Sequence, residues 1–426
     1  MPRASNTHPS DTSGAPNGVD RRSPFDRWFR YAAGFSRATL NRCFEAFTGQ
    51  IGLIIDPFAG VATTGTRAIT EGYAFRGIET HPLIAEIAAL KFSYFDERIA
   101  RDLERTSTNL MASIGGGTRG NVTAEVSLVR RSFDDDTLGQ LVALREMIEN
   151  SERRLVPYLR CALLGTLRDV ASVKVGWPYQ RPALERKPLY RSAPKRFRER
   201  VQWLVDDLAT LPIGIDARIT VSDSRSETSW QTALGETKAR ICLSSPPYLN
   251  NFDYADATRL ELYFLGAVTC WAELCREVRG NMVAATTQQS TQRRAEAGWE
   301  TLGHLPQTMR LARELCTRLS QQRRERPRGK EYDQMLPAYL ADISKVLKQA
   351  YKYIEEGGML AWVVGDSAPY GIYVDTPALI SSLAAEVGFT PFEDVTLRPR
   401  GKRWALNGAR HKVALSERLI ILRRGN

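Results

Sequence analysis

The stretch that most constrains the fold alternates between short apolar runs and helix-like segments. The run Ile51–Ile55 is rich in β-branched residues and leads through a glycine-containing loop to a helix-like segment, Thr64–Glu71. Gly72 is placed to end that helix, after which Ala74–Glu79 has the pattern of a second strand and Pro82–Phe95 that of a second helix. This order has the spacing of a βαβ unit, whose strands are parallel. We therefore predict an α/β fold built on a doubly wound parallel sheet. The sheet pattern resumes near the C-terminus with a helix at Tyr339–Ile354, a stop at "EEGG" and a strand-like stretch at Met359–Ser367.

Acidic residues stand at the ends of the predicted strands. Asp56 follows the first strand and opens the loop "DPFAGVATT", in which Gly60 allows a tight turn and a close approach of the backbone to a ligand. Glu79 ends the second strand, and Asp223 ends a later one, Ala217–Ser224. Ligands of open α/β sheets bind at this end of the strands, where a carboxylate can accept the hydroxyls of a ribose. Each residue alone also fits an ordinary turn, cap or solvated strand end, but together they indicate a site for an adenosine-like ligand without a phosphate clamp.

A rigid corner follows another apolar strand. The sequence "SSPPY" contains Ser245, Pro246, Pro247 and Tyr248, directly after "ARICL". Two prolines remove two N–H donors and fix two φ angles, so carbonyl groups are left without an internal partner. Such a corner suits an amino group, because the Ser245 hydroxyl and the Pro246 carbonyl can each accept one of its hydrogens. The Tyr248 ring offers a face on which a planar base can stack. A plain turn is the ordinary alternative.

The motifs "DPFAGVATT", "GIE" and "SSPPY", in this order, resemble those of the S-adenosylmethionine-dependent amino-methyltransferases that modify DNA. Among these, the Ser-Pro-Pro-Tyr corner is similar to that of the N4-cytosine enzymes, whereas N6-adenine enzymes more often have Asp or Asn in its first position. The resemblance covers Phe25–Glu79, Ala217–Gly266 and, more loosely, Tyr339–Leu422. It implies a Rossmann-like methyltransferase sheet with S-adenosylmethionine as cofactor.

The resemblance also implies roles for individual residues. Glu79 binds the cofactor's ribose, Asp223 its adenine, and the segment "AGFS" before Arg37 covers its methionine end. One departure is Ala62, which stands where the family usually has a second glycine. The implied cofactor-binding residues are Phe35, Asp56, Pro57, Phe58, Gly60, Thr63, Glu79 and Asp223, and the implied catalytic residues are Ser245, Pro246, Pro247 and Tyr248.

The resulting hypothesis is site-specific methylation of cytosine N4 in double-stranded DNA, with the base flipped out of the helix. The reaction fits a restriction-modification or defence system, with a cognate restriction endonuclease as a possible partner. Three alternatives stay open: N6-adenine methylation of DNA, amine methylation of RNA, and a catalytically silent nucleic-acid-binding relative. The cytosine C5 reaction is disfavoured because it needs a Pro-Cys nucleophile, and the chain contains no Pro-Cys dipeptide.

The chain of 426 residues carries a formal net charge of +11, which fits a polyanionic partner such as DNA. Two segments combine cations with aromatic or amide side chains and are candidates for reading the bases, Ser172–Arg200 and Gly280–Lys330. The loop Arg398–Trp404 is a candidate phosphate contact.

The expected organisation divides the chain into six parts. These are a disordered tail at 1–22, the cofactor half of the methyltransferase domain at 23–96, a helical and basic insertion at 97–215, the domain part with the corner at 216–266, a polar and basic insertion at 267–335 and the C-terminal part of the domain at 336–426.

The remaining composition favours a cytoplasmic protein. The six cysteines are scattered without a Cys-x-x-Cys pair, and the four histidines complete no zinc pattern, so no metal site is expected. No apolar run reaches the length needed to span a membrane, and the N-terminus lacks the apolar core of a signal peptide.

Overall fold

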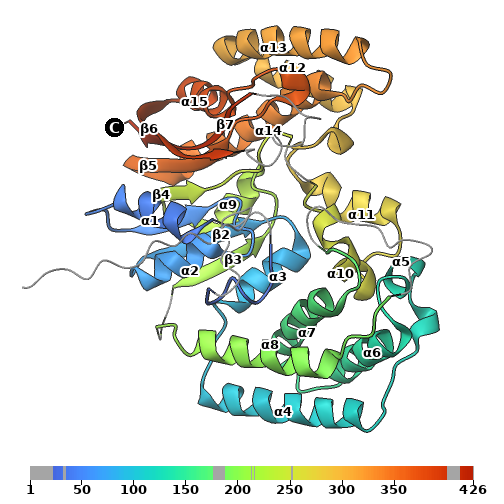
Figure 1. Cartoon of the computed structure of the whole chain (residues 1–426). Helices are drawn as coiled ribbons and strands as arrows, with labels where there is room; N and C mark the ends of the chain where they lie inside the picture. Colours follow the sequence, from blue (N-terminus) through green and yellow to red (C-terminus); the bar gives the residue numbers. More distant parts are fainter. Residues whose placement is uncertain are drawn as a thin grey trace, which may run out of the picture.

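Figure 1 shows the computed structural model of the chain, which describes residues 23–31, 35–175, 188–212, 214, 216–250, 253–400 and 413–425. The predicted disordered tail, the middle of Ser172–Arg200 and most of the loop Arg398–Trp404 lie outside these residues.

A seven-stranded sheet with the order β3-β2-β1-β4-β5-β7-β6 forms the centre of the molecule. The first five strands in this order pair in parallel, and β7 runs antiparallel to both of its neighbours. The predicted doubly wound, Rossmann-like sheet is therefore confirmed. Its strands are β1 (Leu53–Asp56), β2 (Ala74–Glu79), β3 (Ala217–Val221), β4 (Ala239–Ser244), β5 (Ile354–Gly365), β6 (Phe389–Arg400) and β7 (Leu415–Arg424).

Helices cover both faces of the sheet because neighbouring strand residues point to opposite sides. Ile54 packs in the apolar cluster beneath α1 and α2, whereas Ile55 belongs to the cluster beneath α9, α14 and α15. In the same way Ile421 faces the first cluster and Ile420 the second. The covering helices are α1 (Arg37–Glu45), α2 (Thr63–Thr70) and α3 (Pro82–Leu90), then α9 (Glu227–Leu234), α14 (Tyr332–Tyr353) and α15 (Thr376–Val387).

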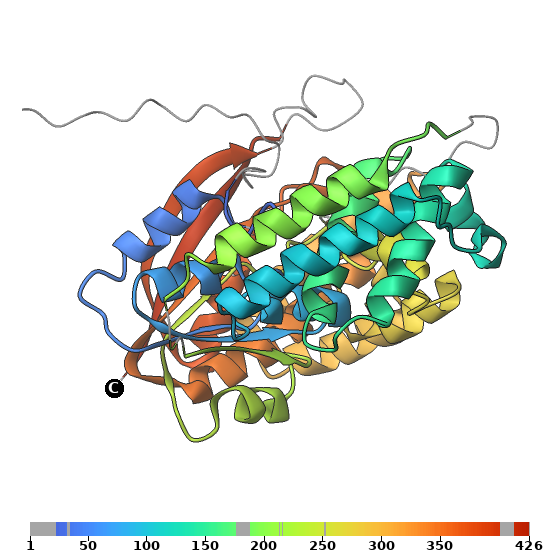
Figure 2. The same cartoon turned by 90° about the horizontal axis from the view of Figure 1, so that it is seen from below.

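The predicted helical insertion forms a second apolar core. Its main helices are α4 (Glu97–Gly115), α5 (Ser127–Arg130), α6 (Asp135–Glu149), α7 (Val156–Val170) and α8 (Ala193–Leu208). Helices α4 and α8 run side by side in both views (Figures 1 and 2). The same core includes the N-terminal aromatics Phe25, Trp28 and Phe29 and the helix α10 (Arg259–Phe264). The insertion therefore holds the segment that precedes the sheet.

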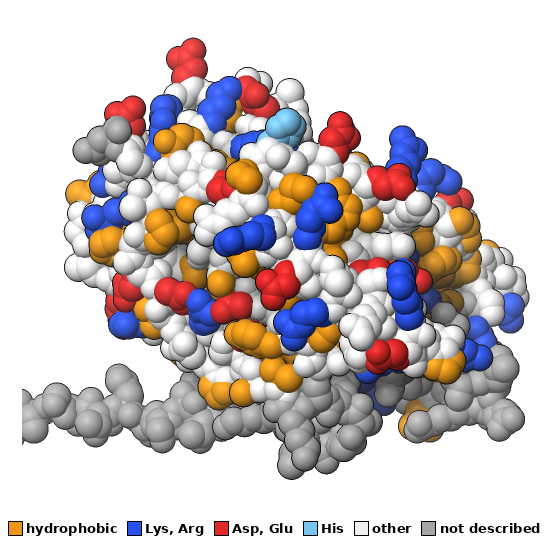
Figure 3. All heavy atoms as spheres, turned by 90° about the horizontal axis from the view of Figure 1, so that it is seen from above, with side chains coloured by type: hydrophobic (Ala, Val, Ile, Leu, Met, Phe, Trp, Pro, Cys, Tyr) orange, Lys and Arg blue, Asp and Glu red, His pale blue; other side chains and the backbone are white. Residues whose placement is uncertain are grey.

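The second insertion contributes α11 (Trp271–Glu277), α12 (Gln292–Leu302) and α13 (Pro306–Arg324). Helices α12 and α13 pack against α14, at the opposite end of the molecule from α4 and α8 (Figure 1). On the face seen in Figure 3, Lys and Arg side chains are scattered among acidic and apolar ones, without a continuous basic patch. None of the helices in the described ranges is long and apolar enough to cross a bilayer.

Two boundaries near the C-terminus differ from the sequence pattern. We expected a helix from Tyr339 and a strand from Met359, but α14 already begins at Tyr332 and runs through Pro337. Strand β5 begins directly after this helix, because Ala239 of β4 pairs with Ile354. The register then shifts, and the intervening residues, including Gly357 with φ of 68°, bulge out of the ladder. The "EEGG" sequence is therefore an irregularity inside a strand and not a stop between helix and strand.

Candidate functional site

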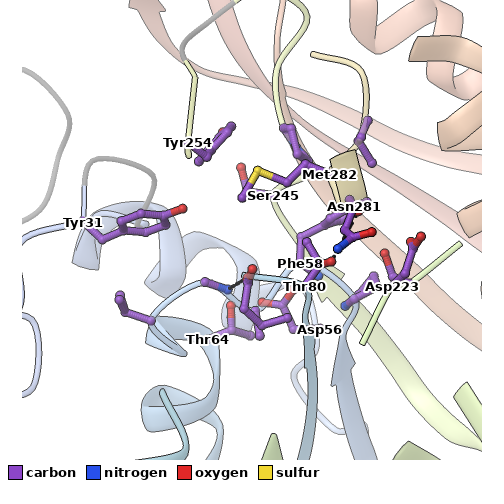
Figure 4. A pocket seen from close by; sticks show the side chains of 18 of the residues that line it. Tyr31, Asp56, Phe58, Thr64, Thr80, Asp223, Ser245, Tyr254, Asn281 and Met282 are labelled. Atoms are coloured by element: carbon purple, nitrogen blue, oxygen red, sulfur yellow. Dashed lines mark hydrogen bonds between the residues drawn. The ribbon is translucent and has the colours of Figure 1, made fainter. Parts of the chain in front are cut away.

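A pocket opens at the carboxyl edge of the sheet, above the strands β3, β2, β1 and β4 (Figure 4). It encloses about 900 Å³ of empty space, part of which is open to solvent. The strand order reverses between β1 and β4, which is the switch point where ligands of doubly wound sheets bind. The fold thus brings together predicted site residues from five separate stretches of the sequence. Those that line the pocket are Phe35, Asp56, Pro57, Phe58, Gly60, Thr63, Glu79, Asp223, Ser245 and Pro247.

Glu79 connects β2 to the glycine loop. One of its carboxylate oxygens accepts a hydrogen bond from the Gly60 backbone N–H at 2.8 Å, and the other accepts one from the His81 N–H, also at 2.8 Å. Burial, opposed by these hydrogen bonds, raises the pKa of Glu79 to about 7. Each oxygen keeps a lone pair that can accept a further hydrogen from a ligand in the pocket.

Asp56 is the second carboxylate of the pocket, and it is more deeply buried than the partly buried Glu79. It is 1% exposed and accepts hydrogen bonds from the Ser244 hydroxyl at 2.5 Å and from the Phe58 backbone N–H at 3.0 Å. Burial raises its pKa to about 6. In the described part of the chain neither Asp56 nor Glu79 takes part in an ion pair, so both acids depend on hydrogen-bond donors. Two such acceptors facing a pocket fit the hydroxyls and the cationic amino group of an adenosine-containing ligand.

The glycine loop adopts a left-handed conformation at two positions. Gly60 has φ of 52°, and Ala62, at the start of α2, has φ of 58° and ψ of 41°. Left-handed backbone costs a residue with a Cβ roughly 1 kcal/mol and favours glycine. This conformation accounts for the second glycine in the pattern that the loop resembles, and Ala62 accommodates it while its methyl group is fully buried.

Asp223 lies on the same side of the pocket as Asn281 (Figure 4). Its carboxylate is paired with Arg225, whose Nη2 lies 2.7 Å from Asp223 Oδ2. Arg225 also donates to Asp342 at 2.9 Å and to the Asn281 carbonyl at 3.1 Å. The charge of Asp223 is therefore shared with an arginine, and the same arginine fixes the wall that carries Asn281.

The wall opposite the glycine loop contains residues that sequence analysis missed. Asn281, Met282, Val283 and Gln289 line the pocket, although they belong to the segment Gly280–Lys330 that we expected to read bases. The start of that segment is instead built into the pocket. Nothing in its polar sequence signals this, because the contact depends on how the chain folds back after β4.

The Ser-Pro-Pro-Tyr corner lies at the rim of the same pocket. Ser245 and Pro247 line it, whereas Pro246 and Tyr248 are not among its lining residues. The Ser245 hydroxyl donates to the Val363 carbonyl of β5 at 3.1 Å. The Tyr248 hydroxyl, 3.3 Å from Ser245 Oγ, donates to Glu417 at 2.9 Å.

The ring of Tyr248 is also in contact with a cation. The Arg400 guanidinium carbon lies 4.8 Å from the ring centroid, and Arg400 Nη1 donates to the Asp366 carbonyl at 2.9 Å. Arg400 and Glu417 come from the antiparallel strands β6 and β7, and sequence analysis identified neither.

Aromatic residues close the side of the pocket opposite Asp223. The rings of Tyr31 and Tyr254 lie 6.1 Å apart, and Figure 4 shows both facing the cavity. Phe35, from the segment "AGFS", also lines the pocket, and the first two residues of that segment lie outside the described residues. Asp207 of α8 holds the preceding turn, accepting hydrogen bonds from Phe25 N at 2.7 Å and from Trp28 Nε1 at 2.8 Å.

The chain resembles known DNA-modifying enzymes over most of its length. It is 21% identical over 443 aligned residues to the type II methyltransferase M.BsoBI of Geobacillus stearothermophilus, covering 95% of this chain and 86% of that protein. It is 21% identical over 407 residues to the type II methyltransferase M.AvaI of a Nostoc species, covering 90% of this chain and 83% of that protein. No family model matches the sequence.

Two solved structures were also found. One is a DNA modification methylase from Thermus thermophilus, described as putative, with 23% identity, a TM-score of 0.17 and coverage of 21% of this chain and 38% of that one. The other is the rRNA methyltransferase aviRa from Streptomyces viridochromogenes, with 9% identity, a TM-score of 0.29 and coverage of 90% of this chain and 83% of that one. The chain is thus similar in sequence to type II DNA methyltransferases.

Proposed function

We propose that the protein transfers a methyl group from S-adenosylmethionine to the exocyclic N4 amine of cytosine in double-stranded DNA. The observation that carries this proposal is the position of Ser245, which lines a pocket that also contains the buried carboxylate Asp56 and the partly buried carboxylate Glu79. In this proposal an amine acceptor and an adenosine site share one cavity. Similarity to type II methyltransferases supports DNA as the substrate and a role as the modification partner of a restriction endonuclease.

In this proposal the pocket binds the cofactor with its adenosine toward Glu79 and Asp223. Glu79 accepts the two ribose hydroxyls with the lone pairs that its backbone bonds leave free. Phe58 offers a ring to the adenine, and Asp223 accepts from its amino group. Asp56, Thr63 and the aromatics on the far side bind the methionine portion. The bound cofactor supplies an electrophilic methyl group on a sulfonium.

The corner then prepares the amine for attack. An exocyclic amine is a weak nucleophile because its lone pair is delocalised into the ring. The Ser245 hydroxyl oxygen and the Pro246 carbonyl accept its two hydrogens, which favours a pyramidal nitrogen with its lone pair directed at the methyl group. The nitrogen–carbon bond forms as the carbon–sulfur bond breaks, sulfur keeps the bonding electron pair, and the nitrogen loses one proton to solvent. Positioning and electrostatics supply the rate enhancement without a covalent enzyme intermediate.

Cytosine N4 is favoured over adenine N6 by the serine in the first position of the corner. The test is to express the chain in a host without DNA methylation and to sequence the host DNA by a method that detects modified bases. The proposal predicts N4-methylcytosine within one fixed short motif. Methylated adenine in such a motif would overturn the choice of base, and unmodified DNA from a well-folded, cofactor-binding protein would overturn DNA as the substrate.

A further inference from the structure

The Tyr248 hydroxyl belongs to a chain of hydrogen bonds that the proposed reaction does not explain. It donates to Glu417 Oε1 at 2.9 Å, and the side chain of Glu417 is only 7% exposed. The other oxygen, Glu417 Oε2, accepts from Arg398 Nε at 2.6 Å, and Arg398 Nη2 makes a longer bond of 3.3 Å to Oε1. Glu417 lies on β7 and Arg398 on β6, so the two strands beyond the parallel part of the sheet reach the Ser-Pro-Pro-Tyr corner through this carboxylate.

The ring of Tyr248 has little freedom to leave this arrangement. Arg400 stacks on it at 4.8 Å, and a Cβ added to Gly365 would lie 2.8 Å from Tyr248 Cδ2 and 2.0 Å from Arg400 Nη1. The glycine is therefore the residue that lets the ring and the guanidinium approach β5 together. Because the ring is held in place, the Tyr248 hydroxyl can change only the direction in which its hydrogen points.

Glu417 fixes that direction. A carboxylate paired with arginine accepts hydrogen bonds and donates none, so the phenol must donate to it. Burial raises the pKa of Tyr248 well above its usual value, and the phenol keeps its proton. The Tyr248 hydroxyl hydrogen is then unavailable to Ser245 Oγ, 3.3 Å away. The Ser245 hydrogen in turn points into the protein, toward the Val363 carbonyl or the Tyr248 oxygen, and the serine lone pairs are free to face the pocket.

We propose that Glu417, held by Arg398, is a positioning residue that makes Ser245 a hydrogen-bond acceptor for the substrate amine. This inference rests on the proposed function, because it concerns the same amine. It predicts that reversing the hydrogen-bond direction at Glu417 harms catalysis more than deleting the Tyr248 hydroxyl.

The variant Glu417→Gln performs this reversal. Arg398 Nε lies 2.6 Å from Oε2 but Arg398 Nη2 lies 3.3 Å from Oε1, so the amide oxygen takes the place of Oε2 and the NH₂ group faces Tyr248. Tyr248 then accepts and turns its own hydrogen toward Ser245. We expect kcat for DNA methylation to fall roughly 10- to 100-fold, as for the loss of one hydrogen bond to a buried polar group. The dissociation constant for S-adenosylmethionine and the KM for DNA should stay within about twofold, since neither involves the direction of this hydrogen.

The variant Tyr248→Phe keeps the ring and removes the hydroxyl, so nothing competes for the Ser245 lone pairs. It should lose less of the wild-type kcat than Glu417→Gln does, and the double variant Tyr248→Phe/Glu417→Gln should recover most of the activity that Glu417→Gln loses. The matched control is Asp394→Asn, which removes an exposed Arg418 partner on the same strand pair and should leave kcat unchanged. Thermal unfolding of every variant separates lost activity from lost folding.

A purely structural role for Glu417 predicts a different pattern. Losses would then add in the double variant, and the more destabilised protein would be the less active one. An active wild type whose kcat is unchanged by Glu417→Gln, or a double variant no better than Glu417→Gln, overturns the inference and leaves the proposed function standing. A wild type that binds cofactor but methylates no DNA overturns the proposed function, and the inference with it.

Discussion

Replacing Glu79 with glutamine tests the cofactor site at its most connected residue. The two carboxylate oxygens accept from Gly60 N and His81 N at 2.8 Å each. Glutamine has one oxygen, so its NH₂ group must face one of these N–H donors and leave it unsatisfied. The same amide also presents a donor where a ribose hydroxyl needs an acceptor. Glu79→Gln therefore disturbs both the glycine loop and the ligand contact.

The expected size of the effect follows from hydrogen bonds to a charged group, which contribute about 1.5–3 kcal/mol each. Loss of one such bond to the ribose weakens S-adenosylmethionine binding by roughly 10- to 150-fold. The pH dependence has a definite sign. The pKa of Glu79 is about 7 in the free protein, and hydroxyl donors favour the ionised carboxylate, so binding must release a proton below that pH. Affinity should rise by up to about tenfold per pH unit as pH increases toward 7 and level off above it.

Isothermal titration calorimetry with S-adenosylmethionine, between about pH 6 and pH 8, measures both effects. The ionised state of His81 does not interfere, because burial lowers its pKa to about 3. Glu236→Gln, an exposed acid on the loop before β4, is the matched control and should bind like the wild type. If Glu79→Gln bound the cofactor as tightly as the control, with the same pH profile as the wild type, Glu79 would not hold the ribose and the assignment of the pocket would be refuted.

Two other substitutions test the parts that support the site. Gly365→Ala places a methyl group 2.8 Å from Tyr248 Cδ2 and 2.0 Å from Arg400 Nη1. The rate of DNA methylation should therefore fall at least about tenfold, while the cofactor affinity measured by calorimetry stays unchanged. Wild-type activity in this variant would show that the Tyr248 ring does not need its close approach to β5. Asp207→Asn weakens the buried acceptor of Phe25 N and Trp28 Nε1 and should lower the free energy of unfolding in urea by about 3 kcal/mol. An unchanged urea midpoint would contradict the role given to α8.

The sequence was most informative about site residues whose position depends on a single strand and the loop that follows it. Asp56 and Glu79 each end a run whose pattern predicts a strand, and parallel strands bring their carboxyl ends to one edge. Their meeting in one pocket therefore needed no knowledge of the rest of the chain. The turns at Gly60 and Gly72 were also predicted from the sequence, and both glycines have positive φ in the structure.

Contacts between distant elements could not be predicted in this way. Glu417 lies 169 positions from Tyr248, and its side chain reaches the phenol only because of the register between β5 and β7. Asn281 and Gln289 join the pocket wall because a polar segment folds back after the corner, and polar composition alone suits a surface equally well. The partner of Asp223 was missed for a related reason, since Arg225 is held in place by Asp342 from α14.

The central claim is that Ser245 activates the N4 amine of cytosine, and analysis of the modified nucleoside tests it most directly. Purified wild type and Ser245→Ala are each incubated with S-adenosylmethionine carrying an isotopically labelled methyl group and with unmodified duplex DNA, which is then digested to nucleosides for mass spectrometry. We predict labelled N4-methylcytosine from the wild type and none from Ser245→Ala, although the variant binds the cofactor with unchanged affinity. Label on adenine N6, or equal amounts of N4-methylcytosine from both proteins, would contradict the claim.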